Sequence, residues 1–146
     1  MPGPRPNQAQ GAGASAIGSV LVALAAGALA AVVGTILHAS LGYVGDVPVP
    51  WGAALALLLT GTLTYWVGLV RGKLWVSALT GLATYVFVAL ISIDQHNQMI
   101  VSTQFFKMLP GPALAGGIWV YGIIVPVIVA ILLVSKQLRL LARSGH

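Results

Sequence analysis

Charged side chains and cysteine are what this sequence of 146 residues most lacks. Only 6% of its residues are charged, whereas 58% are hydrophobic and the mean hydropathy is +0.97. Soluble domains carry roughly a quarter charged residues, so these few charges cannot cover a surface exposed to water. No cysteine is present, which excludes disulfides, cysteine-ligated zinc, iron–sulfur clusters and a cysteine nucleophile. The composition therefore excludes a soluble globular fold and indicates a membrane protein.

Recognisable catalytic motifs are also missing. The sequence contains no legible Ser–His–Asp arrangement, no phosphate loop of the Walker type and no dinucleotide fingerprint. The net charge of +5 is not organised into a basic stripe with interleaved aromatics, so nucleic acid is not an expected partner. Ionisable residues at membrane depth mark most transport pathways, and almost none falls inside the apolar stretches. We expect a protein without catalytic activity and without a cofactor.

Four stretches have the length and apolar character of membrane-spanning helices, which need about 20 residues. Their apolar residues do not alternate with a period of two, so barrel strands are excluded and helices remain. The sequence therefore predicts an all-α integral membrane fold with four transmembrane helices. We place the spans at residues 16–39, 51–70, 74–93 and 114–135. Pro126 should bend the fourth span and free the carbonyl of Gly122.

The segment before the first span is rich in proline and glycine. We expect residues 1–14 to form a flexible cytoplasmic tail and residues 15–146 to form a single membrane domain. The apolar run of the first span is longer than the 7–15 residues typical of a signal peptide, which predicts that this span is retained.

The distribution of basic residues predicts the orientation. Two loops should lie on the external side: the one after the first span and the one after the third span. Lys107 is the only Lys or Arg in these loops, and both acids, Asp46 and Asp94, lie in them as well. Cytoplasmic loops carry an excess of Lys and Arg, so we expect both termini in the cytoplasm of a bacterial cell and a location in its inner membrane. The basic residues that should face the cytoplasm are Arg5, Arg71, Lys73, Lys136, Arg139 and Arg143.

Aromatic residues near the ends of the spans favour the membrane–water interface. Trp51 and Trp119 are two of these residues, and Tyr121 is a third. We interpret all of them as interfacial anchors.

Small residues recur every four positions along the first span. Such a row lets two helix backbones approach closely and gain van der Waals contact. The sequence predicts a packing seam here, whose partner is an internal helix, a second copy or another protein. The seam consists of Ser19, Ala23, Gly27, Ala31 and Thr35.

The segment between the third and fourth spans is the longest external loop. Its apolar residues recur at helical spacing and predict a short amphipathic helix on the outer surface. This helix would either dock a partner or pack on the lipid surface. The candidate docking residues are Val101, Phe105, Phe106 and Met108.

Imidazole and carboxylate groups are expected at one depth on the external side. His38, Asp94 and His96, with Asp46 in the facing loop, could bind zinc or copper. Two axial histidines, His38 and His96, could instead hold a haem. The simpler interpretation is that these polar residues merely lie at the membrane–water interface.

Two segments carry a resemblance to a known group of proteins. Residues 33–38 (Val-Gly-Thr-Ile-Leu-His) and residues 47–52 (Val-Pro-Val-Pro-Trp-Gly) resemble small four-helix membrane proteins of unknown function from actinobacteria. The resemblance implies a four-span inner-membrane protein and implies no activity.

The expected function is that of an accessory or scaffolding subunit. Such a subunit of a larger membrane complex, a respiratory complex for example, needs spans and packing faces but no buried charge. One alternative is a small homo-oligomeric channel or transporter, whose lumen would be lined by the hydroxyls of Thr60, Thr62, Thr64, Thr80 and Thr84. A further alternative is a haem- or metal-binding membrane protein that uses His38 and His96.

Overall fold

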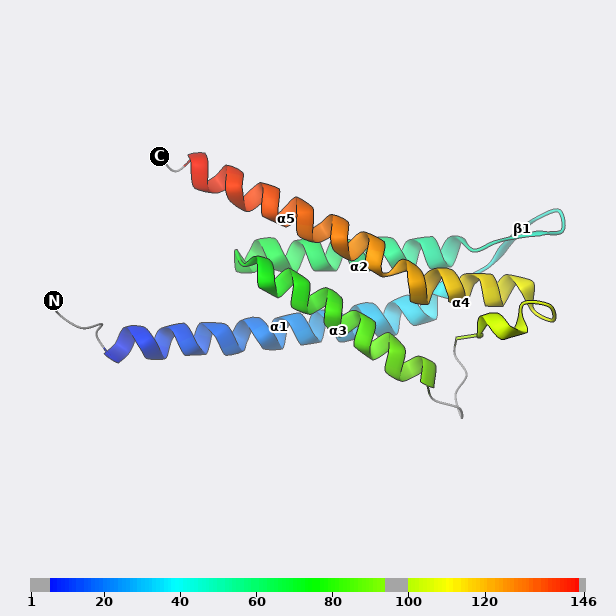
Figure 1. The fold of residues 1–146 in the computed structure, drawn as a ribbon, viewed down its shortest axis with the longest axis horizontal. Helices are drawn as coiled ribbons and strands as arrows, with labels where there is room; N and C mark the ends of the chain where they lie inside the picture. Colours follow the sequence, from blue (N-terminus) through cyan, green and yellow to red (C-terminus); the bar gives the residue numbers. More distant parts are fainter. Residues whose placement is uncertain (1–5, 94–99, 145–146) are drawn as a thin grey trace.

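The computed structural model describes residues 6–93 and 100–144, with side chains from residue 16 onward. It is a bundle of long helices that run along one axis (Figure 1). The helices are α1 (Pro6–His38), α2 (Trp51–Arg71), α3 (Leu74–Ile93), α4 (Pro110–Gly122) and α5 (Ile124–Ser144).

Among the described residues, four helical stretches are long and apolar enough to cross a membrane, as predicted. They are Ala16–His38, Trp51–Arg71, Leu74–Ile93 and Pro110–Ser144. The first three agree with the predicted spans to within one residue at each end. The fourth, which combines α4 and α5, starts four residues earlier and ends nine residues later than the predicted 114–135.

The helix α1 starts ahead of its apolar stretch. It begins at Pro6 and includes residues 6–14, for which the composition predicts a flexible tail. A proline at the first helical position leaves no hydrogen bond unmade, because the N–H groups of the first turn have no partner inside the helix.

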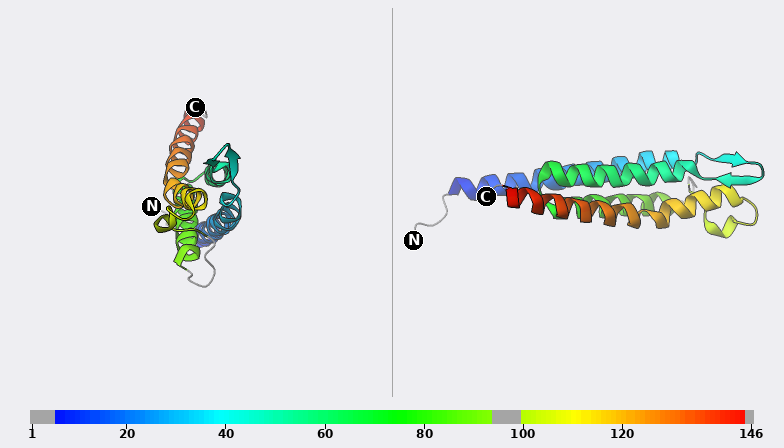
Figure 2. Two further views of the ribbon diagram at one scale, coloured as in Figure 1. Left: turned by 90° about the vertical axis from the view of Figure 1, so that its right-hand side faces the viewer. Right: turned by 90° about the horizontal axis from the view of Figure 1, so that it is seen from above.

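The helices α2 and α3 form the centre of the bundle, since each packs against α1, against α5 and against the other. The start of α1, the end of α5 and the α2–α3 connection lie at one end of the molecule, which we call the terminus end (Figures 1 and 2). The start of α4 lies at the opposite end, which we call the hairpin end after the two strands there.

The connection between α1 and α2 is a β-hairpin rather than an irregular turn. The strands β1 (Gly42–Val44) and β2 (Val47–Val49) pair antiparallel, with Tyr43 opposite Pro48. Gly45 has a φ of 61°, a conformation that two-residue hairpin turns require and glycine adopts without strain. The Gly45-Asp46 pair between two β-prone runs is the sequence signal for this hairpin.

The fourth helical stretch is broken where the proline predicts a bend. α4 ends at Gly122 and α5 begins at Ile124, and the chain changes direction there (Figure 1). Pro126 has no N–H to donate to the carbonyl of Gly122. The next N–H, that of Val127, donates to the carbonyl of Ile123 at 3.3 Å.

Candidate functional site: the α1 seam and its two polar ends

The seam residues of α1 all face the interior of the bundle. All five are buried, whereas Leu21, Leu24 and Ala25 on the other side of the helix are exposed. Because α1 packs on α2 and α3, the partner of the seam in this structure is internal. The buried residues are Ser19, Ala23, Gly27, Ala31 and Thr35.

Gly27 lies at a close approach of α1 to α3. A Cβ atom at this position would lie 2.6 Å from the Cβ of Ala83 and 3.0 Å from the carbonyl oxygen of Thr80. Both distances are shorter than a van der Waals contact, so the two backbones approach as closely as they do only because residue 27 has no side chain.

The seam ends in a charged contact at the terminus end. Arg71, the last residue of α2, donates hydrogen bonds from Nε and Nη2 to the hydroxyl oxygen of Ser19, at 3.1 and 2.8 Å. A Cβ atom at Gly18 would lie 3.3 Å from the same guanidinium. The small residues 18 and 19 thus give the Arg71 side chain room to lie across α1.

The opposite end of the seam holds a fully buried tryptophan. Trp119 of α4 is 0% exposed, and its Nε1–H donates to the hydroxyl of Thr35 at 3.2 Å. The indole ring fits against α1 because Gly34 has no side chain: a Cβ atom there would lie 2.3 Å from the ring. The interpretation of Trp119 as an interfacial anchor is therefore wrong.

His38 completes this polar end. Its ring stacks on Trp119 with centroids 6.5 Å apart and an interplanar angle of 18°, and its Nδ1 is hydrogen-bonded to the carbonyl of Thr35. Residues 34, 35 and 38 recur at helical spacing, and this is the signal by which the sequence could have revealed a site on α1 for a large partner side chain.

Most hydroxyl groups in the bundle are bonded to their own helices. Thr60, Thr80 and Thr84 are buried, and each donates to the carbonyl four residues earlier. Ser77 instead donates across to the carbonyl of Thr64 at 2.9 Å. The hydroxyl of Thr64 is the one buried side-chain polar atom without a partner among residues with described side chains.

The candidate metal ligands are only partly described. His38 lies inside the bundle against Trp119, whereas Asp46 is exposed in the hairpin turn. Asp94 and His96 lie outside the described residues. Within residues 6–93 and 100–144, no group of three His, Asp or Glu side chains lies close enough to hold a metal ion.

The candidate docking segment contains one short helical turn. The 3-10 helix η1 spans Thr103–Phe105, and between residues 100 and 109 the chain forms no α-helix of the short amphipathic kind that the spacing predicts. Phe106 and Met108 are exposed, by 51% and 79%, whereas Val101 and Phe105 are half-buried. The backbone of the segment lies close on α4, because a Cβ at Gly116 would meet the Val101 carbonyl oxygen at 2.6 Å.

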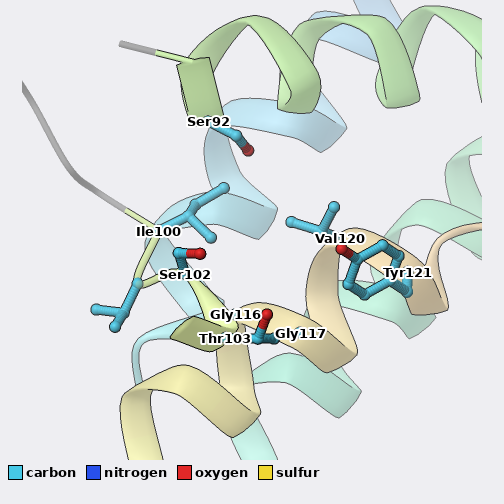
Figure 3. A pocket seen from close by; sticks show the side chains of 9 residues that line it. Ser92, Ile100, Ser102, Thr103, Gly116, Gly117, Val120 and Tyr121 are labelled. Atoms are coloured by element: carbon cyan, nitrogen blue, oxygen red, sulfur yellow. The ribbon is translucent and has the colours of Figure 1, made fainter. Parts of the chain in front are cut away.

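A small cavity of about 170 Å³ lies between this segment, the end of α3 and α4 (Figure 3). Its walls carry the hydroxyls of Ser92, Ser102, Thr103 and Tyr121, and Gly116 and Gly117 form its floor. The Ser92 hydroxyl donates to the Val88 carbonyl at 2.7 Å. Sequence reasoning missed this cavity, for which the Gly116-Gly117 pair was the signal.

Comparison with known proteins gives no relative. No protein-family model matches the chain, and no match was found among curated proteins or among solved structures.

Proposed function

We propose that this protein is a non-catalytic, four-span integral membrane protein with both termini in the cytoplasm of a bacterial cell. Its four apolar helices support insertion. Its basic residues support the orientation, because Arg71 and Lys73 join α2 to α3 at the terminus end and further basic residues end α5 there. Lys107 is the one Lys or Arg of the described residues that belongs to the hairpin end, so the excess of basic residues lies at the terminus end.

We propose further that it serves as an accessory or scaffolding subunit of a larger membrane complex, such as a respiratory complex. The observation that supports this role is that the other helices of the chain bury little of α5. Of its 21 residues, only Ala130 and Val134 are buried. Apolar hollows of about 260 Å³ and 390 Å³ flank it, the first against α2 and the second against α3.

Hollows of this kind favour a neighbouring helix. Small residues form part of both, with Gly61 in the first and Gly81 in the second. In lipid, helices associate through close packing at such residues, since no hydrophobic force draws them together. The α1 seam is filled by the chain's own helices, so a partner would bind along α5.

The position of the hydroxyls favours this role over a channel between several copies. Thr60, Thr80 and Thr84 face the interior of a single chain and are bonded to their own helices. A lumen between copies would be lined by outer faces, which are mostly apolar. Thr62 is exposed there, but its hydroxyl donates to the carbonyl of Leu58 on its own helix at 2.8 Å. The haem alternative lacks a described second ligand for His38, because His96 lies outside the described residues.

Photocrosslinking in the cells that produce the protein tests the accessory role. A photoreactive amino acid at Ile128 on α5 should crosslink to one defined membrane protein. The matched control is Leu29 on the outer face of α1, because the two side chains are 51% and 53% exposed. Equal labelling from both positions, or crosslinks from Ile128 to further copies of this chain alone, would contradict the role.

A further inference from the structure

Basic side chains gather on one side of α5 near its end. Lys136, Arg139 and Arg143 are all exposed, and their spacing of three and four residues places them on one face of the helix. The only acidic residues of the chain are Asp46 and Asp94. Asp46 lies in the hairpin turn at the opposite end, and Asp94 lies outside the described residues.

The basic face begins where α5 leaves the bundle. Val134 packs on the last turn of α2, because a Cβ at Gly68 would lie 3.0 Å from its Cγ2 atom. α2 ends three residues later at Arg71, whereas α5 continues ten residues beyond Val134 to Ser144. At 1.5 Å per residue this is about 15 Å, and α5 projects past the α2–α3 connection (Figures 1 and 2).

The opposite face of this projecting segment is apolar. Val134 is buried, Leu138 is half-buried and Leu141 is 58% exposed. The exposure of this apolar face therefore increases as the helix leaves the bundle. An exposed helix with one basic and one apolar face is typical of segments at the surface of a negatively charged bilayer.

The α2–α3 connection places two more positive charges at the level where the projection starts. Arg71 is hydrogen-bonded to Ser19, and the Nζ atom of Lys73 lies 6.0 Å from the centre of the Trp75 ring. Tryptophan favours the headgroup region. Both cations are therefore held close to the surface of the bundle at the terminus end.

We propose that residues 135–144 of α5, together with Arg71 and Lys73, bind anionic phospholipid headgroups at the terminus end. Lipid phosphates complement the basic face, while the acyl region beneath them accepts the apolar face. Each basic residue near an anionic leaflet strengthens binding to that leaflet by about fivefold. The inference rests on the proposed membrane insertion, since the lipid must surround the chain.

Spin-labelled lipids in nanodiscs that contain the full chain test the proposal. Restricted motion of the label reports lipid at the protein surface, and phosphatidylglycerol is compared with phosphatidylcholine. Wild type should prefer phosphatidylglycerol, and raising the salt from about 0.05 M to about 0.5 M should weaken the preference. The variant K136Q/R139Q/R143Q should lose most of it. An unchanged preference in this variant, or one insensitive to salt, would overturn the proposal.

Three controls separate the other outcomes. K136R/R139K/R143K keeps the charge and should keep the preference, and Lys107→Gln removes a charge at the hairpin end and should change nothing. Inorganic phosphate should compete no better than chloride at equal ionic strength, and stronger competition would assign the site to free phosphate. If neither lipid shows restricted motion, membrane insertion itself fails, whereas restricted motion without preference refutes only the lipid site.

Discussion

Gly27, Gly34 and Gly81 stand where one added carbon would collide with a neighbouring helix. A Cβ at these positions would lie 2.6, 2.3 and 2.3 Å from Ala83, Trp119 and Val127, respectively. Each contact joins two elements far apart in the sequence, so the close packing of the bundle depends on these residues. Overfilling a packed interior typically costs about 1–3 kcal/mol.

The first prediction concerns Gly27. Gly27→Leu should lower the stability of the protein in mild detergent by at least about 2 kcal/mol, because α1 and α3 must separate to admit the side chain. Thermal unfolding followed by circular dichroism measures the loss. Ala25→Leu is the matched control, since Ala25 is exposed on the same helix and should tolerate the change. Equal losses would mean that the α1 seam is not a tight interface.

The second prediction concerns the hydrogen bond between Trp119 and Thr35. Thr35→Val should leave the buried indole N–H without an acceptor, which costs about 1–3 kcal/mol. Trp119→Phe removes that donor, so the double variant T35V/W119F should be more stable than the sum of the two single losses predicts. Strict additivity in this double-mutant cycle would show that the bond contributes nothing.

At the scale of the elements, the first three spans could be predicted because hydrophobicity and length are local properties. The second span begins at Trp51 and ends at Arg71, and the third begins at Leu74, each within one residue of the expected limit. The bend at Pro126 was predictable for the same reason, since the missing N–H belongs to that residue alone.

Other features depend on contacts that the sequence does not display. The burial of Trp119 requires Gly34 to lie opposite it, and only the three-dimensional packing of α1 on α4 brings the two together. The segment before α4 has the spacing of an amphipathic helix but forms one 3-10 turn. Close contact between the Val101 backbone and Gly116 accompanies this irregular path.

The third prediction concerns the end of α2. Gly72 has a φ of 60°, and the N–H groups of Gly72 and Lys73 donate to the carbonyls of Leu69 and Gly68 at 3.0 and 3.2 Å. This pair of hydrogen bonds is the Schellman motif, which favours glycine at the position of Gly72. No atom lies within 4 Å of a Cβ added there, so any cost comes from the backbone alone.

Gly72→Ala should therefore destabilise the protein by about 1 kcal/mol, because the left-handed conformation penalises a Cβ. Gly72→Asn should cost less, since asparagine tolerates this conformation. Chemical unfolding in mixed micelles gives both values. A loss for asparagine as large as that for alanine would refute the backbone explanation.

At the scale of the whole molecule, the two ends differ in charge. The terminus end carries Arg71, Lys73 and the basic residues of α5, whereas the hairpin end carries Lys107 and Asp46. In an inserted chain, this asymmetry would favour one orientation relative to the membrane. Our central proposal is that the terminus end faces the cytoplasm and that the chain crosses the bilayer four times.

The absence of cysteine from the chain allows the most direct measurement of this topology. Single cysteines replace Asn7, Asp46, Lys107 and Ser144 in turn, and a maleimide that cannot cross the membrane is applied to spheroplasts. We predict labelling at positions 46 and 107 in intact spheroplasts, and labelling at positions 7 and 144 only after permeabilisation. Labelling of either terminal position in intact spheroplasts would contradict the four-span arrangement with cytoplasmic termini.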